Sequence, residues 1–83
     1  MIEIDPDQSY YRWHDGHIEE WMVFSLFTHP NGCRFVSFGR FAIDGKPETL
    51  NNIPVSDVEK ENFISADELK CVVEDYCRAK FDN

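Results

Sequence analysis

The histidines are the first residues whose types and spacing could carry chemistry. His14 and His17 flank Asp15-Gly16, a dipeptide that favours a two-residue type I′ hairpin turn because both central residues need positive φ. Across such a hairpin the two imidazoles face each other at roughly 5 Å between Cβ atoms, close enough to share a metal ion. The next candidate ligands, His29 and Cys33, lie roughly 35 Å away at about 3.3 Å per strand residue. We therefore expect exposed turn histidines, with no metal and no cofactor.

The three cysteines offer little more. Cys71 and Cys77 are about 120° apart around a helix and roughly 9 Å apart along it, which excludes a disulfide between them. Cys33 has His29 nearby, but a cysteine nucleophile needs a lowered thiol pKa and an oriented base, and no sequence feature provides either. We expect Cys33 to be half-buried in a strand, Cys77 to lie in the core and Cys71 to be a surface thiol.

Carboxylates are abundant, but any two of the 16 acids will be neighbours somewhere in a chain of 83 residues, so pairs such as Glu19 and Glu20 are poor evidence for acid–base catalysis. Phosphate-binding loops, dinucleotide fingerprints, C-x-x-C and H-E-x-x-H are all absent from the sequence. One small sheet and one helix also leave little room for a substrate pocket. We expect no catalytic residues and no enzymatic activity.

Composition and charge narrow the class of protein further. A length of 83 residues allows a single domain, and a hydrophobic content of 42% lies above the range of disordered chains. The net charge of −8 disfavours direct binding to nucleic acid or to an anionic membrane. The chain also has no apolar leader and no run approaching about 18 apolar residues, so we expect a protein of the reducing cytoplasm.

Turn signals divide the chain into strands. Segments 10–14, 17–28 and 33–43 are rich in strand-forming residues and are separated by Asp15-Gly16 and by a His-Pro-Asn-Gly break. We predict a single α+β domain, 1–83, with a three- to four-stranded antiparallel meander, a loop over 51–62 and a C-terminal helix. Segment 1–4 could add an edge strand, and a short fourth strand is expected near 48–53.

The C-terminal helix is predicted over 66–81. Ser65 and Glu68 form a capping box, and Ile64 and Leu69 are placed as a hydrophobic staple. An apolar stripe at helical spacing is expected to pack on the sheet. It consists of Ala66, Leu69, Val72, Val73, Tyr76 and Cys77.

Both faces of the second and third strands are apolar, and one helix can cover only one face of a sheet. The other face must meet the N-terminal segment, segment 46–62, a second copy of the chain or a partner protein. If it is exposed, the candidate contact residues are Trp21, Phe24, Phe38 and Arg40, because aromatic residues and arginine dominate binding energies at interfaces. A wholly structural interpretation, with these side chains in the core, is the competing hypothesis.

A resemblance bears on the function. The pattern Tyr11-x-Trp13, Asp15-Gly16 and Trp21, followed by Phe63-x-Ser65-x-x-Glu68 and Val73-Glu74-x-Tyr76, resembles small acidic phage and mobile-element proteins of the anti-CRISPR type. The resemblance covers most of the chain, but it is one of type and assigns no residue roles. It implies an inhibitor of a nucleoprotein complex in a bacterial host.

The acidic surface suggests how such an inhibitor would bind. Carboxylates can occupy the positions of phosphates in the basic groove of a nucleic-acid-handling protein such as a CRISPR effector. The candidate acids are Asp57, Glu59, Glu61, Asp67, Glu68, Glu74 and Asp75. The alternatives are a homodimer or adaptor that binds through the aromatic sheet face, and an immunity protein for a basic toxin.

Overall fold

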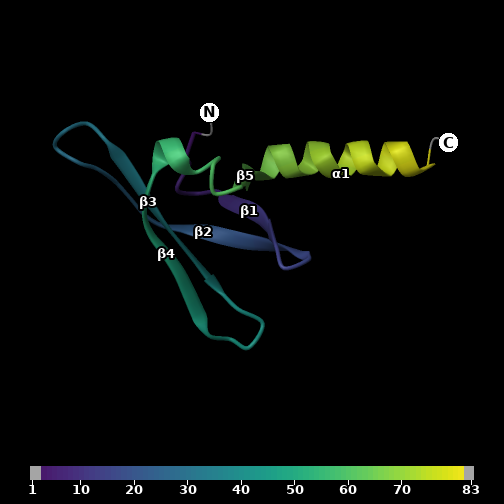
Figure 1. The fold of residues 1–83 in the computed structure, drawn as a ribbon, viewed down its shortest axis with the longest axis horizontal. Coiled ribbons are helices and arrows are strands. Elements are labelled where there is room, and N and C mark those ends of the chain that lie inside the picture. Colours follow the sequence, from purple (N-terminus) through teal and green to yellow (C-terminus); the bar gives the residue numbers. More distant parts are fainter. Residues whose placement is uncertain (1–2, 82–83) are drawn as a thin grey trace.

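The structure, a computed structural model, describes residues 3–81. Five antiparallel strands form one sheet in the order β4-β3-β2-β1-β5, and helix α1 follows the last strand (Figure 1). This confirms the α+β fold, with five strands where three or four were predicted. The strands are β1 (Ser9–His14), β2 (His17–Thr28), β3 (Arg34–Phe41), β4 (Pro47–Pro54) and β5 (Ile64–Ser65); the helices are the short 3-10 helix η1 (Val55–Asp57) and α1 (Ala66–Phe81).

The first hairpin has the geometry that its turn residues favour. Asp15 and Gly16 both adopt positive φ, at 50° and 79°, as a type I′ turn requires. The resulting register places His14 directly opposite His17. The turn therefore sets the pairing of β1 with β2, and with it the faces on which their side chains lie.

Strand β4 is longer than the sequence suggested, because it takes in part of the predicted loop over 51–62. A bulge lets it continue: Asn52 adopts a φ of 57°, and its backbone N–H donates to Ser37 Oγ at 3.0 Å. Strand β3 ends at Phe41, whereas the predicted strand ran to residue 43. The last two predicted residues belong to the connection into β4. The predicted edge strand over 1–4 is not found at residues 3 and 4, and its first two residues lie outside the described part of the chain.

The hydrophobic core lies on one face of the sheet, which we call the inner face. Side chains from β1, β2 and β3 on this face are covered by the N-terminal segment and by the segment between β4 and β5. The core consists of Ile4, Tyr10, Trp21, Val36, Phe38, Val58 and Phe63. Phe63 stacks on Phe38, with ring centroids 4.5 Å apart, and meets Trp21 edge-on at 6.2 Å.

The hydroxyl of Tyr10 anchors the N-terminal segment over this core. It accepts a hydrogen bond from the Asp5 N–H at 2.7 Å and donates to the Glu3 carbonyl at 3.1 Å. The buried phenol is thus satisfied by backbone groups of the segment that covers it. Two of the four coverings considered from the sequence, the N-terminal segment and part of segment 46–62, therefore lie on the inner face.

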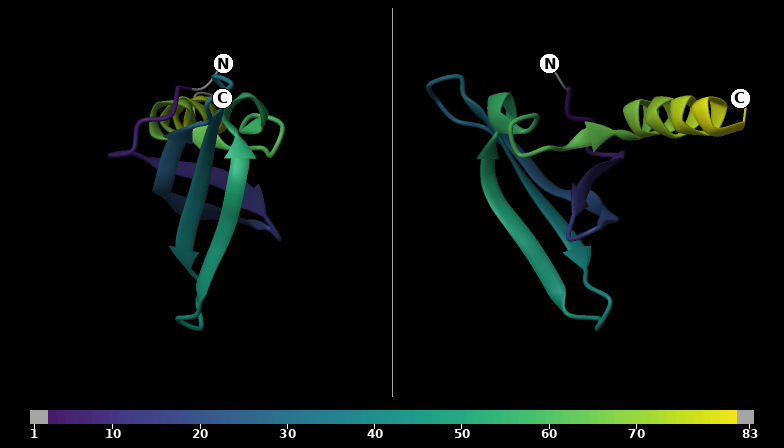
Figure 2. Two further views of the ribbon diagram at one scale, coloured as in Figure 1. Left: turned by 90° about the vertical axis from the view of Figure 1, so that its left-hand side faces the viewer. Right: turned by 45° about the vertical axis from the view of Figure 1, so that its right-hand side comes forward.

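Helix α1 extends away from the sheet, which corrects the expectation that its stripe packs on a sheet face. Figures 1 and 2 show that it continues outward from the edge formed by β5 and β1. The physical reason is that β5 passes into α1 at Ala66 without an intervening turn, while residues 55–63 already occupy the inner face. Val72 and Tyr76 in the stripe remain 59% and 63% exposed.

The cysteine expectations are wrong at two of the three positions. Cys77 is exposed, because no element within residues 3–81 covers this part of the helix, and Cys33 is exposed beside the β2–β3 turn. Cys71 is an exposed thiol, as predicted.

Candidate functional site

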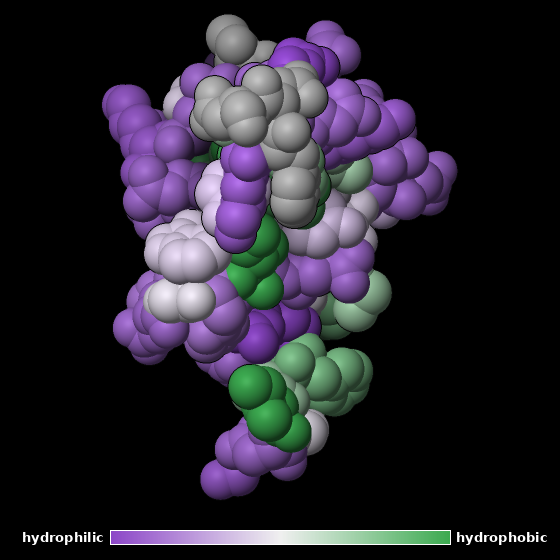
Figure 3. Space-filling view, turned by 90° about the vertical axis from the view of Figure 1, so that its right-hand side faces the viewer, coloured by the Kyte–Doolittle hydropathy of each residue, from purple (hydrophilic) through white to green (hydrophobic). Residues whose placement is uncertain are grey.

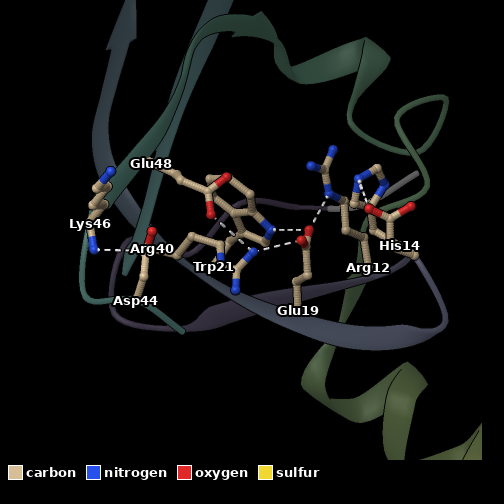
Figure 4. Close-up of polar contacts among 9 residues, drawn as sticks. Arg12, His14, Glu19, Trp21, Arg40, Asp44, Lys46 and Glu48 are labelled. Carbon is tan, nitrogen blue, oxygen red and sulfur yellow. Dashed lines mark hydrogen bonds and ion pairs between the residues drawn. The ribbon is translucent and has the colours of Figure 1, made fainter. Parts of the chain in front are cut away.

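The inner face changes from apolar to charged towards the β1–β2 hairpin. There the carboxylate of Glu19, only 5% exposed, accepts hydrogen bonds from Arg12 Nε at 2.8 Å and Arg40 Nη1 at 2.6 Å (Figure 4). It also accepts one from the Trp21 indole N–H at 3.1 Å. Glu48 adds a second contact to Arg40, at 3.4 Å. Four charged side chains from four strands thus form one continuous network.

Glu19 is held in its ionised form. Burial by itself raises the pKa of this carboxyl, but the hydrogen bonds from Arg12 and Trp21 and the charges of Arg12 and Arg40 outweigh that effect and lower the pKa. A carboxylate with a lowered pKa is a weak base, so the arrangement favours a structural ion-pair network over proton transfer.

The two arginines also lie against aromatic rings. The guanidinium carbon of Arg12 is 5.0 Å from the Trp21 ring centroid, and that of Arg40 is 5.5 Å from it. Arg40, which the sequence suggested as a contact for a partner, is therefore engaged on three sides by groups of its own chain. It is not available as a free cation.

A polar hollow of about 480 Å³ lies beside this network, between the β1–β2 and β3–β4 hairpins. His14 and His17 line it, and His14 Nε2 is 3.5 Å from Asp15 Oδ2. The two histidines are directly opposite each other in the hairpin register, as predicted. Among residues 3–81, however, no three His, Cys, Asp or Glu side chains are grouped so that they could hold a metal ion.

The opposite face of the sheet, which we call the outer face, carries several large apolar side chains that no segment within residues 3–81 covers. Alternation along the strands places its side chains opposite those of the core. Phe24 and Phe41 are 75% and 69% exposed. The outer face consists of Trp13, Ile18, Met22, Phe24 and Phe41. Figure 3 shows apolar side chains gathered towards the β3–β4 hairpin, at the bottom of that view.

A shallow cleft of about 290 Å³ crosses the outer face between Met22 and Phe41. Gly39 is opposite Met22 and has no side chain to fill the cleft. A Cβ at this position would project into the cleft, 3.9 Å from the Phe24 side chain. Pro47 and Thr49 of β4 complete the lining on the far side. A hollow with apolar walls beside exposed aromatic rings is suited to receiving an apolar side chain of another molecule.

One polar pair lies within the outer face, because Glu20 stands between Ile18 and Met22 in the alternation of β2. Tyr11 Oη donates to Glu20 Oε2 at 2.9 Å across β1 and β2. This hydrogen bond is the main reason why the pKa of the Tyr11 phenol is raised, with burial and the negative charge of Glu20 adding to it. The outer face thus carries one acidic group among its apolar side chains.

The structure divides the four aromatic and basic residues predicted from the sequence. Phe24 lies on the outer face, as a binding residue should. The predictions for Trp21 and Phe38 are wrong, because both side chains are fully buried on the inner face. The neighbours Met22 and Phe41 were missed. The sequence feature that could have identified them is strand alternation, which places Met22 and Phe41 on the opposite face from Trp21 and Phe38. Alternation alone does not show which of the two faces the rest of the chain covers.

The predicted acids do not form one array. Asp57, the last residue of η1, is half-buried and lies 3.5 Å from Lys60 Nζ, whereas Glu59 and Glu61 are exposed in the turn that follows. The other four are exposed on α1, where Asp75 is 3.5 Å from Arg78 Nη1. Those four, Asp67, Glu68, Glu74 and Asp75, share the helix with three bases, so the helix carries a net charge of only −1.

Comparisons with known proteins add no family. No protein-family model, no curated protein and no solved structure matches this chain. The described residues include no helix long and apolar enough to cross a membrane.

Proposed function

We propose that this protein is a non-catalytic binding protein that recognises another protein through its outer face. The observation that carries the proposal is the set of large apolar side chains left in solvent around a cleft, on a sheet whose other face already has a complete core. A cluster of exposed large apolar side chains such as Met22, Phe24 and Phe41 is typical of binding sites.

The charge of the surroundings indicates the chemistry of the partner. Glu20 lies on the outer face, and the whole chain carries a net charge of −8. A partner with an apolar projection surrounded by lysine and arginine fits this surface, because complementary potentials speed association and exclude other proteins. Nucleic-acid-handling proteins, CRISPR effectors among them, have basic surfaces of this kind. Three unpaired cysteines support a location in a reducing bacterial cytoplasm.

The test is a tagged pull-down from a nuclease-treated bacterial lysate, followed by binding measurements with the purified partner. We expect Phe24→Ser and Phe41→Ser to weaken binding at least tenfold, since exposed aromatic anchors at interfaces carry about 2 kcal/mol or more each. Glu61→Gln is the matched control, because it changes an exposed residue away from the outer face. Equal binding by all three variants would overturn the proposal.

A second candidate function is inhibition by mimicry of nucleic-acid phosphates, as the resemblance to anti-CRISPR proteins implies. It is favoured by the projection of α1, which presents Asp67, Glu68, Glu74 and Asp75 away from the body of the molecule (Figure 2). A mimic should be released by about 0.5 M salt or by added DNA, and should lose affinity when these acids become amides. A complex formed through the outer face should survive the salt wash and the added DNA, and its affinity should not change when the acids of α1 become amides.

An immunity protein for a basic toxin would use the same acidic surface. It differs from a mimic in one measurable respect, because added nucleic acid would leave its complex intact unless the toxin itself binds nucleic acid at the same groove. The salt dependence of the association rate would be steep in both cases.

A further inference from the structure

A second hollow, of about 290 Å³, lies beside the apolar cleft of the outer face. It forms where β2 and β3 separate: their pairing reaches only as far as Met22 and Gly39, and beyond this pair the β1–β2 and β3–β4 hairpins diverge (Figures 1 and 2). The outer-face residues that line it are Ile18, Glu20, Met22 and Phe41. Because Met22 and Phe41 also line the cleft, the two hollows are adjacent.

The second hollow contains one carboxylate whose charge is not balanced by its own chain. Glu20 is exposed and forms no ion pair within residues 3–81, although its Oε2 accepts a hydrogen bond from the Tyr11 hydroxyl. Arg40 also lines the hollow, but it is already paired with Glu19 and Glu48. The hollow is therefore complementary to a cation supplied by another molecule.

The lining of the second hollow favours arginine over lysine as that cation. A guanidinium group is planar and weakly hydrated, so it can donate to a carboxylate while it stacks on an aromatic ring, whereas an ammonium group is compact and strongly hydrated. Phe41, which is 69% exposed, provides such a ring. Ile18 and Met22 provide apolar surface for the methylene groups of the side chain.

The positions of the two hollows indicate the spacing of the groups that they receive. Glu20 lies two residues before Met22 on β2, and Met22 is opposite Gly39 in the cleft. At about 3.3 Å per strand residue this offset is about 6.6 Å, which is also the distance between alternate side chains of an extended chain. Alternate side chains of an extended chain point to the same side.

We propose that the outer face recognises an extended segment of its partner in which a large apolar residue and an arginine occupy alternate positions. The apolar side chain enters the cleft between Met22 and Phe41, and the arginine binds Glu20. This inference rests on the proposed binding function and adds the chemistry of the recognised segment. The cleft supplies apolar burial, and the carboxylate supplies the preference for a basic residue at one position.

Two acetylated and amidated tripeptides, Leu-Ser-Arg and Arg-Ser-Leu, are suitable probes, because either chain direction satisfies the spacing. Titration at low salt, followed by amide NMR of isotope-labelled protein, should give saturable shifts in β2 and β3 with a Kd of about 1 mM for at least one peptide. Citrulline, a neutral isostere, should weaken binding about fivefold in place of arginine. Glycine in place of leucine should weaken it about tenfold. The absence of saturable shifts with either peptide at about 20 mM would overturn the proposal.

Two variants separate the two contacts. Glu20→Gln removes the charge but keeps an oxygen that can accept from Tyr11, so this variant should bind the arginine and citrulline peptides equally. Gly39→Ala adds a methyl group to the cleft, so it should weaken both peptides by the same factor and keep the preference for arginine. Glu61→Gln, at an exposed acid away from both hollows, should change neither affinity. A preference for arginine that persists in Glu20→Gln would contradict the proposed contact.

The partner obtained by pull-down distinguishes this inference from the proposed function. If Phe24→Ser weakens binding of the partner at least tenfold and Glu20→Gln weakens it about fivefold, both are supported. If Phe24→Ser weakens binding but Glu20→Gln does not, the outer face is the binding site and the recognition of arginine is wrong. If neither substitution affects binding, the proposed function is wrong as well.

Discussion

Arg40 on β3 reaches across to Glu19 on β2, with its Nη1 2.6 Å from the carboxylate oxygen Oε2. The two residues are 21 positions apart in the sequence. Because Arg12 on β1 binds the other carboxylate oxygen of Glu19, this one acid ties three strands together. The pair stands where the apolar core ends, so it closes the inner face with charges that satisfy one another.

Removing the charge of Glu19 should destabilise the fold. In Glu19→Gln the largely buried Arg12 guanidinium loses its ionised partner and Arg40 keeps only its longer contact with Glu48, and breaking a buried pair in this way costs about 3 kcal/mol. The midpoint of urea unfolding should fall accordingly, with an unchanged slope. Glu20→Gln, which alters an exposed neighbour, should cost less than about 1 kcal/mol. Equal losses in the two variants would contradict a special role for Glu19.

The same network makes stability depend on pH. The pKa of Glu19 is lower in the folded chain than in the unfolded chain, where a glutamate titrates near about 4.3. The unfolded state therefore binds more protons between the two values, so this contribution is complete above about pH 5 and is lost as pH falls through the lowered pKa. Urea unfolding at a series of pH values should show wild type and Glu19→Gln converging in acid. A constant difference between them would disprove the linkage.

Much of the fold follows from local sequence signals. Asp15-Gly16 determines a turn because few other dipeptides adopt positive φ twice, and that turn sets the β1–β2 register. Strand β4 was predicted only in part because Pro47, Pro54 and two asparagines disfavour strands, whereas β3 beside it supplies the pairing that forms one. The bulge at Asn52 could not be foreseen, since it depends on the Ser37 hydroxyl of a neighbouring strand.

The binding surface was harder to predict than the fold. Trp21 and Met22 are adjacent in β2 and are both apolar, so alternation separates them into two faces but does not say which face the rest of the chain covers. That outcome depends on where residues 55–63 settle. The stripe on α1 has the same ambiguity, because an amphipathic pattern requires a partner without identifying it.

The start of α1 should depend strongly on its cap. Ser65 Oγ accepts a hydrogen bond from the Glu68 N–H at 3.1 Å, and such caps stabilise helices by about 1 kcal/mol. Since the helix has few other contacts with the body, Ser65→Ala should fray its first turns while the sheet stays folded. Hydrogen exchange should become faster for amides of residues 66–70 but not for those of β2 and β3. Ser56→Ala, at an exposed serine in η1, serves as the control.

A substitution at Gly39 should affect the stability of the sheet and the binding function of the outer face in opposite directions. Its backbone is not in the left-handed region, and a Cβ there would meet only Phe24 side-chain atoms and the Glu48 carbonyl oxygen, all at about 3.9–4.0 Å, which is ordinary contact. Gly39→Ala should therefore stabilise the protein slightly, by about 0.4–1 kcal/mol, because it restricts the unfolded chain. The same methyl group fills the floor of the cleft between Met22 and Phe41, so affinity for a partner bound there should fall. Thermal unfolding measures the first effect and calorimetric titration with the purified partner the second. A variant that binds as tightly as wild type would show that the cleft receives no side chain.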